Sequence, residues 1–180
     1  MSEIILVEPS IEYKEEIEAF RREVLEHDAD NDDRFAGCML LDRSSAEEWI
    51  RICTLRKNED TCRTVGAAVP SHTWLAVREN DRRLVGIIDL RHHIDHPVLG
   101  TWGGHCGYTV RPYERGKGYG KEMLRLNRKN AAVLGISRLL VTCSTDNTAS
   151  ERIILANGGV YESTVNVDGC PIKRYWVPVS

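Results

Sequence analysis

The feature that most constrains the fold is a glycine-rich turn between an extended segment and an amphipathic helix. It occupies residues 110–120 and reads VRPYERGKGYG. Glycines let the backbone approach a phosphate without obstruction by side chains, and a helix that begins at such a turn directs the positive end of its dipole at the same point. The chain is therefore predicted to contain a strand, turn and helix that hold an anionic group.

The spacing of this turn excludes two well-known phosphate loops. A Walker A loop would need glycine at Arg111 and serine or threonine at Gly118. A dinucleotide fingerprint counted from Gly116 would need glycine or alanine at Lys121. Neither alternative fits.

Hydrophobic periodicity on both sides of the turn predicts an α+β order with a mostly antiparallel sheet. The helix after the turn is expected to bury Tyr119, Met123, Leu126 and Val133. In chain order we expect a strand at 3–9, a helix from Ser10, a helix after caps at 42–45, a hairpin over 73–93, a strand at 104–111, a helix over 118–135, a strand at 138–144, a helix from Asn147 and a hairpin closed by Asp168 and Gly169.

Composition sets the class of protein. A chain of 180 residues with 42% hydrophobic residues is expected to form a single domain, residues 1–180. It has no signal-peptide pattern and no apolar run of about 20 residues, so we expect a cytoplasmic protein without a membrane partner. Six cysteines lack a C-x-x-C pair, which favours free thiols. The net charge of -3 argues against a nucleic-acid partner.

The turn resembles the acetyl-CoA signature of the GNAT (GCN5-related N-acetyltransferase) superfamily, (Q/R)-x-x-G-x-(G/A) after a strand that ends V-x-P. Arg115, Gly118 and Gly120 occupy its fixed positions, and Val110 and Pro112 occupy the flanking ones. The resemblance implies an α+β fold with a mixed, mostly antiparallel sheet of about seven strands, flanked by about four helices. It also implies that two central strands splay apart to admit the pantetheine arm.

The second half of the chain agrees with this resemblance. Asn147 and Ser150 form the N-x-x-(A/S) pattern that follows the splayed strand, and Gly158 ends the helix. The segments LRHH, GGHCGYTVRP and KRYW further resemble a bacterial group of predicted acetyltransferases. The family likeness implies acetyl-CoA as cosubstrate, no metal, and cofactor contacts from Thr109, Val110, Arg115, Gly116, Lys117, Gly118, Tyr119, Gly120, Asn147 and Ser150.

The resemblance also suggests catalytic roles. Backbone N–H groups of Thr109 and Val110 would stabilise the carbonyl oxygen of the thioester. His105 is the candidate general base, because an imidazole titrates near neutral pH, and Asp89 and His93 compete for that role.

The resemblance assigns no proton donor, because the family often carries a tyrosine where this chain has Ile154. Tyr108, Cys143 or solvent stay open as the proton donor.

Three further patterns have a functional and an ordinary interpretation. Lys121, Arg125 and Arg128 either approach the 3′-phosphate of the coenzyme or form a solvated helix face. The HHIDH segment at 92–96 contains metal-ligand types, but adjacent histidines make a poor tetrahedral site. The acidic run at 26–33 either attracts a cationic acceptor or is a solvated loop.

The sequence thus predicts an N-acetyltransferase that moves an acetyl group from acetyl-CoA to a primary amine, on a small molecule or a peptide, by direct attack. The alternative is a catalytically weak coenzyme A-binding sensor or regulatory module, suggested by Ile154. A homodimer through the terminal strands also stays open.

Overall fold

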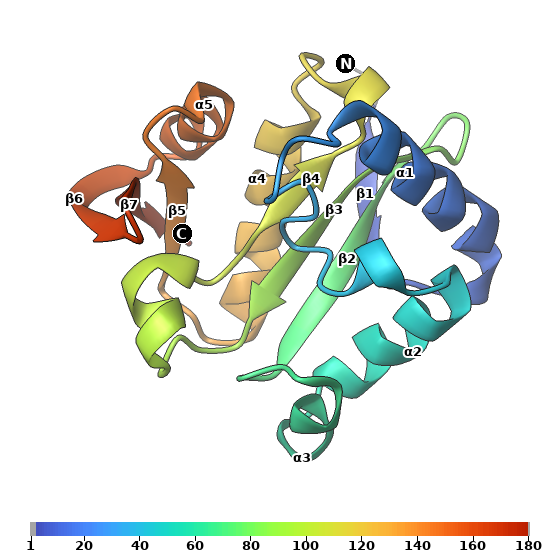
Figure 1. Ribbon diagram of the computed structural model, residues 1–180, viewed down its shortest axis with the longest axis horizontal. Helices are drawn as coiled ribbons and strands as arrows, with labels where there is room; N and C mark the ends of the chain where they lie inside the picture. Colours follow the sequence, from blue (N-terminus) through green and yellow to red (C-terminus); the bar gives the residue numbers. More distant parts are fainter. Residues whose placement is uncertain (1–2, 180) are drawn as a thin grey trace.

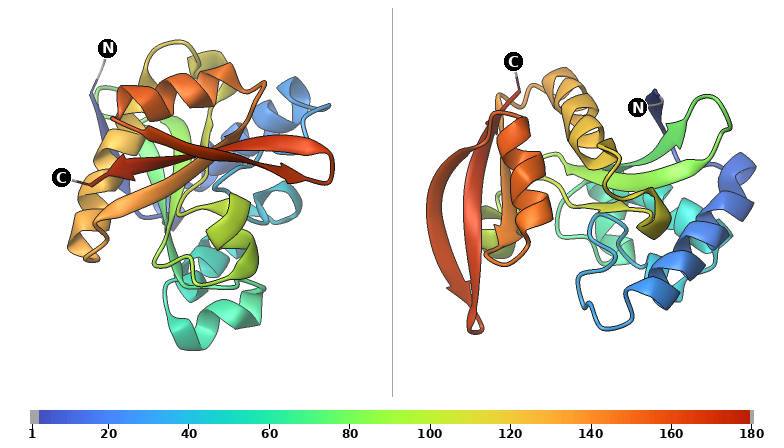
Figure 2. Two further views of the ribbon diagram at one scale, coloured as in Figure 1. Left: turned by 90° about the vertical axis from the view of Figure 1, so that its left-hand side faces the viewer. Right: turned by 90° about the horizontal axis from the view of Figure 1, so that it is seen from above.

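The strands form two sheets that open away from each other (Figures 1 and 2) in a computed structural model that describes residues 3–179. The first sheet has the order β1 (Ile4–Val7), β2 (Ser71–Arg78), β3 (Leu84–Arg91) and β4 (Tyr108–Val110); the second has the order β5 (Arg138–Ser144), β7 (Cys170–Pro178) and β6 (Val160–Val167). Every strand pair is antiparallel. The predicted α+β class with splayed central strands is confirmed.

Helices cover both faces of the first sheet (Figure 2). On one face lie α1 (Lys14–His27) and α2 (Ala46–Arg56), and the short α3 (Glu59–Cys62) packs against α2 beyond the ends of the strands (Figure 1). On the other face lies α4 (Tyr119–Val133), and α5 (Thr148–Ala156) packs beside α4. Short helical turns complete the described part: η1 (Ile11–Tyr13), η2 (Leu41–Arg43), η3 (Arg63–Val65), the π-helix η4 (Leu99–Gly103) and η5 (Pro112–Glu114). In the strand order, β4 is the edge of the first sheet, on the side of the second sheet (Figure 1).

Local signals in the sequence explain where several elements begin and end. The Ser45 hydroxyl accepts a hydrogen bond from the first turn of α2, and the Asn147 side chain does the same for α5. Gly135 follows α4 with φ +73°, a conformation that favours glycine. Asp168 and Gly169 both have positive φ between β6 and β7. These predicted caps and turns are confirmed.

Two details of the sequence prediction are wrong. Val133 is 87% exposed, because it lies two residues after the fully buried Ala131 and therefore on the opposite side of the helix. The strand expected at 104–111 contains only Tyr108–Val110, because the Gly107 amide donates to the Asp89 side chain and not to a β3 carbonyl. The carbonyls of Gly107 and His105 still accept from Asp89 and Arg91 of β3. His105 therefore lies before β4 rather than on it.

A buried arginine ties α1 to the first sheet. Arg111 is 2% exposed, and its Nε and Nη2 donate to the two carboxylate oxygens of Glu23 at 2.8 and 2.7 Å. Its Nη1 donates to Glu16 Oε2 at 2.8 Å and to the Leu84 carbonyl at 3.0 Å. The same Glu16 oxygen accepts from the Leu84 amide at 2.8 Å. The helix, β3 and the end of β4 are therefore held at one place.

Replacing Arg111 should destabilise the fold, because Glu16 and Glu23 would keep their charges without this partner. Arg111→Gln is expected to lower the free energy of unfolding by about 3 kcal/mol, measured by urea denaturation. Arg22→Gln, an exposed arginine on α1, is the control and should change it by less than about 0.5 kcal/mol. Equal losses in the two variants would contradict the role of the buried pairs.

Candidate functional site

The two sheets meet at His105. Its backbone N–H donates to the Leu140 carbonyl at 2.8 Å, and its side-chain Nδ1 accepts from the Leu140 N–H at 2.8 Å. Its carbonyl accepts from Arg91 of β3 at 2.7 Å. The preceding Gly104 has φ +67°, and a Cβ there would lie 2.5 Å from the Leu140 carbonyl oxygen. Beyond this joint, the described strands β4 and β5 share no ladder and belong to separate sheets.

One edge of β4 is therefore unpaired. The backbones of Gly107 and Arg111 hydrogen-bond to β3. Because antiparallel strands alternate in the direction of their backbone groups, the N–H of Thr109 also points at β3, and those of Tyr108 and Val110 point at the free edge. The sequence prediction paired Val110 with Thr109 and missed the Tyr108 amide, although the two-residue period of a strand places it beside Val110.

The side chains of β4 point alternately to the two faces of the sheet. The Thr109 hydroxyl donates to the carbonyls of Arg34 and Ala36 at 3.1 and 2.8 Å, in the loop after α1 that crosses β4 (Figure 1). The Tyr108 hydroxyl bonds to the Ser150 hydroxyl at 2.7 Å, in the first turn of α5. The strand thus has an α1–α2 side and an α4–α5 side.

The glycine-rich turn presents a row of backbone amides at the start of α4. Gly116 and Gly118 have φ +74° and +86°, and a Cβ at Gly116 would meet nothing within 4 Å. Within residues 3–179, no acceptor is bonded to the amides of Gly116, Lys117 or Gly118. Consecutive free amides at the N-terminus of a helix bind anions, and the open space at Gly116 leaves room for one. The turn therefore fits a phosphate group.

The charged side chains of the turn are bonded to the protein itself. The Arg115 guanidinium pairs with both carboxylate oxygens of Asp28 and donates to the Val110 carbonyl at 3.1 Å. Its hydrogen bonds hold the pKa of Asp28 below the ordinary value. Lys117 Nζ donates to the buried Glu114 at 2.9 Å. The side chains of Arg115 and Lys117 therefore stabilise the turn, and the groups left to bind an anion are its backbone amides.

The other predicted cofactor residues also have structural partners. Tyr119 is buried, and its hydroxyl accepts from Arg78 at 3.3 Å. A Cβ at Gly120 would lie 2.5 Å from Ile153 Cδ1, so glycine permits the close approach of α4 to α5. The Asn147 Oδ1 caps α5 by accepting from the Ser150 amide at 3.0 Å. These residues bring the starts of α4 and α5 to the same end of β4.

The candidate bases lie around the joint. Burial lowers the pKa of His105 to about 4, with Arg91 adding to the effect, and its Nδ1 already accepts from Leu140. Asp89 is 1% exposed and accepts from the Gly107 amide at 2.6 Å. His93 lies after the end of β3, not on it, and its Nδ1 is 3.5 Å from an Asp95 oxygen. None of the three combines a free acceptor atom with a place beside the β4 edge.

Comparison with protein families decides the identity of the fold. Residues 8–160 match the family model described as an acetyltransferase (GNAT) domain. The chain belongs to the GNAT acetyltransferase family. It is an acyltransferase, as predicted. No curated protein matches the sequence.

Solved GNAT-type structures share the fold at low identity. One is the microcin C7 self-immunity acetyltransferase MccE in complex with acetyl-CoA and AMP, 16% identical, with a TM-score of 0.67 over 98% of this chain and 92% of that one. Another is RimL, a ribosomal L7/L12 alpha-N-protein acetyltransferase, 19% identical, with a TM-score of 0.63 over 99% of this chain and 95% of that one. A third is a spermidine N-acetyltransferase chimera of Vibrio cholerae SpeG and hSSAT, 11% identical, with a TM-score of 0.65 over 99% of this chain and 96% of that one.

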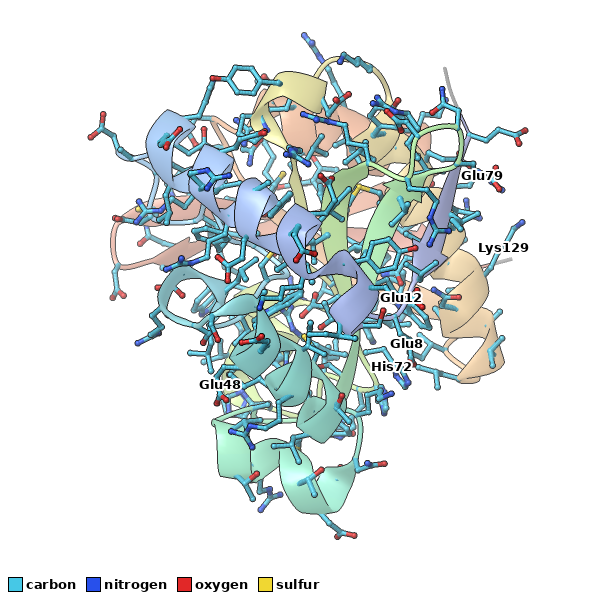
Figure 3. All side chains as sticks on the ribbon, turned by 90° about the vertical axis from the view of Figure 1, so that its right-hand side faces the viewer. Glu8, Glu12, Glu48, His72, Glu79 and Lys129 are labelled. Carbon is cyan, nitrogen blue, oxygen red and sulfur yellow. The ribbon has the colours of Figure 1, made fainter. Side chains whose placement is uncertain are left out.

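The histidine-rich segment does not assemble a metal cluster in the described residues. His92 Nε2 lies 2.8 Å from His72 Nδ1, and Glu8 lies beside His72 where β1 ends (Figure 3). Over residues 3–179, no group of three or more histidine, cysteine, aspartate or glutamate side chains is placed to hold a metal ion.

The six cysteines are free thiols, and only Cys170 is exposed. No described helix has the length and apolar character that crossing a bilayer requires.

The joint at His105 should make the fold sensitive to acid. Because the folded pKa of about 4 lies below the ordinary 6.5, protons bind the unfolded chain more strongly, and stability falls as the pH drops from 6.5 towards 4. The loss between about pH 7 and about pH 4 should be about 3 kcal/mol greater in the wild type than in His105→Asn, measured by urea denaturation. Asparagine keeps an acceptor oxygen for Leu140 and does not titrate. Parallel pH curves for the two proteins would exclude this role for His105.

Proposed function

We propose that this protein transfers the acetyl group of acetyl-CoA to a primary amine by direct attack. The observation that carries the proposal is the meeting of the amide row at residues 116–118 with the free edge of β4. The row suits the pyrophosphate, and the N–H groups of Tyr108 and Val110 suit the pantetheine arm and the thioester carbonyl. The complex of MccE with acetyl-CoA supports this use of the shared fold.

The reaction needs few protein groups. The amine nitrogen attacks the thioester carbon, and a C–N bond forms while negative charge develops on the carbonyl oxygen. Backbone N–H groups at the β4 edge stabilise that oxygen. The C–S bond then breaks, the amide product loses the extra nitrogen-bound proton to solvent, and the thiolate of coenzyme A remains. No enzyme residue is acylated in this sequence.

The acceptor enters from the α1–α2 side of β4. The loop at residues 28–37 is fixed there by Thr109 and by close contact, since a Cβ at Gly37 would lie 2.2 Å from the Gly107 carbonyl oxygen. Asp33 in this loop is exposed, yet the surrounding protein raises its pKa, with Arg91 opposing the rise. The Asp33 carbonyl accepts from the Ala36 amide at 3.1 Å, and the Ala36 carbonyl accepts from Thr109, so the backbone of Asp33 is fixed close to β4. An exposed carboxylate in that place suits a group that binds an ammonium ion and takes its proton.

His105 then has a structural role in place of the predicted base. In the neutral ring Nδ1 accepts from Leu140, so Nε2 carries the proton and has no lone pair for an amine proton.

We also propose that residues 1–180 form one acetyltransferase domain, because the His105 joint and the packing of α4 on both sheets connect its two halves.

A coenzyme A sensor is the second candidate function. The position where the family usually has a tyrosine holds Ile154, which has no hydroxyl and is fully buried. Release of free thiol from acetyl-CoA over a panel of amines separates the two functions. Binding without turnover across the panel would favour the sensor.

Gly118→Val should weaken acetyl-CoA binding more than tenfold by calorimetry, because a branched side chain strains the φ of +86° and disturbs the amide row. Gly135→Val is the matched control, since Gly135 also has positive φ but lies at the far end of α4. Circular dichroism checks that both variants fold. Equal dissociation constants would argue against the amide row as the phosphate site.

Asp33→Asn should lower kcat/KM for an amine acceptor at least tenfold, while leaving the KM for acetyl-CoA nearly unchanged. The acidic limb of the pH profile should also disappear, since the variant no longer titrates there. Asp32→Asn changes the neighbouring exposed carboxylate and serves as the control. If Asp32→Asn has the same effect, general attraction by the loop explains the loss, and Asp33 has no special role.

A further inference from the structure

The Tyr108 hydroxyl occupies a position that neither the amide row nor the acceptor loop uses. We propose that this hydroxyl donates a hydrogen bond to the sulfur of coenzyme A and stabilises the thiolate as it leaves. The inference rests on the proposed function, because it requires the thioester to lie along the free edge of β4. It makes Tyr108 a catalytic residue through both its backbone and its side chain.

The course of the chain brings the sulfur near this hydroxyl. The amide row follows the Val110 end of β4, and the His105 joint closes the other end, so an arm that starts at the row reaches Val110 first and Tyr108 next. In an acetyl thioester the sulfur is bonded directly to the carbonyl carbon. A carbonyl oxygen held by the Tyr108 amide therefore places the sulfur within reach of the side chain of the same residue.

The hydroxyl is held on the α4–α5 side, where the arm would lie. Its partner Ser150 is 2.7 Å away, in the first turn of α5, and the Ser150 amide is itself fixed by Asn147. Either hydroxyl in this pair can be the donor. When Ser150 donates to the Tyr108 oxygen, the phenolic hydrogen can point at the sulfur in place of the Ser150 carbonyl, which is 3.5 Å from the Tyr108 oxygen. Each hydrogen bond in such a chain strengthens the next.

Two other side chains near this hydroxyl do not suit the role. Ile154 has no polar atom, and the Cys143 thiol is 6% exposed, with burial raising its pKa to about 11. Burial also raises the pKa of Tyr108, so the phenol stays protonated while coenzyme A leaves. The hydroxyl therefore acts as a hydrogen-bond donor to the negative sulfur and keeps its proton. The thiolate takes its proton later from solvent, which balances the reaction.

The test uses coenzyme A alone as the probe, so it does not depend on the acceptor. Ultraviolet absorbance of the thiolate gives the pKa of the bound thiol in the wild type and in Tyr108→Phe. A hydrogen bond to the thiolate should make the acid dissociation constant about tenfold larger in the wild type. Tyr161→Phe, which removes an exposed hydroxyl bonded to Thr164 on β6, is the matched control. Equal thiol pKa values in the wild type and Tyr108→Phe would overturn the inference.

Ser150→Ala separates donation from simple ordering of the site. It removes the same Tyr108–Ser150 hydrogen bond but keeps the phenol, so the bound thiol should retain a lowered pKa. If Ser150→Ala raises the thiol pKa as much as Tyr108→Phe does, the contact only orders α5, and direct donation is wrong. Calorimetry with coenzyme A is run beside each titration. A folded wild type that does not bind coenzyme A would refute the proposed function itself.

Discussion

Two hydrogen bonds between His105 and Leu140 set the geometry on which the site depends. They join the sheets at a single place, and past that place β4 and β5 pair with different neighbours. If the two strands paired along their length, the N–H groups of Tyr108 and Val110 would be spent on β5. A splay confined to one side of a tight joint leaves these donors without a strand partner and in fixed positions, as the proposed transfer requires.

The joint works because other contacts prevent the open region from collapsing. Arg111 holds α1 against β3 and β4, and Arg115 holds the glycine-rich turn against the end of α1 through Asp28. The ion pairs of Arg111 are largely buried, so solvent screens them less than it screens a surface ion pair. Backbone groups can serve as the functional groups of this site because charged side chains fix the backbone.

Local and periodic features of the structure were predictable from the sequence. The turn at Gly116 and Gly118, the cap at Asn147 and the hairpin turn at Asp168 depend on residues close in the chain, so the sequence pattern was enough. The partner of His105 is Leu140, which is 35 residues away. Such a contact depends on how the sheets pack, and no local pattern reveals it. Val133 was wrong for a different reason, since a seven-residue step from Leu126 stays on the partly buried side of α4 and not on the buried row of Met123, Asn127 and Ala131.

The alternation along β4 has a consequence for how the protein can change over evolutionary time. Tyr108 and Thr109 direct their side chains to opposite sides, so the contact with α5 and the contacts with the 28–37 loop are separated by one peptide bond. A one-residue insertion in β4 would exchange the two sides. Residues in the loop, in contrast, are free to vary as long as its two carbonyl contacts with Thr109 persist. The sequence of the 28–37 loop can therefore diverge while the contacts among β4, α4 and α5 stay constant.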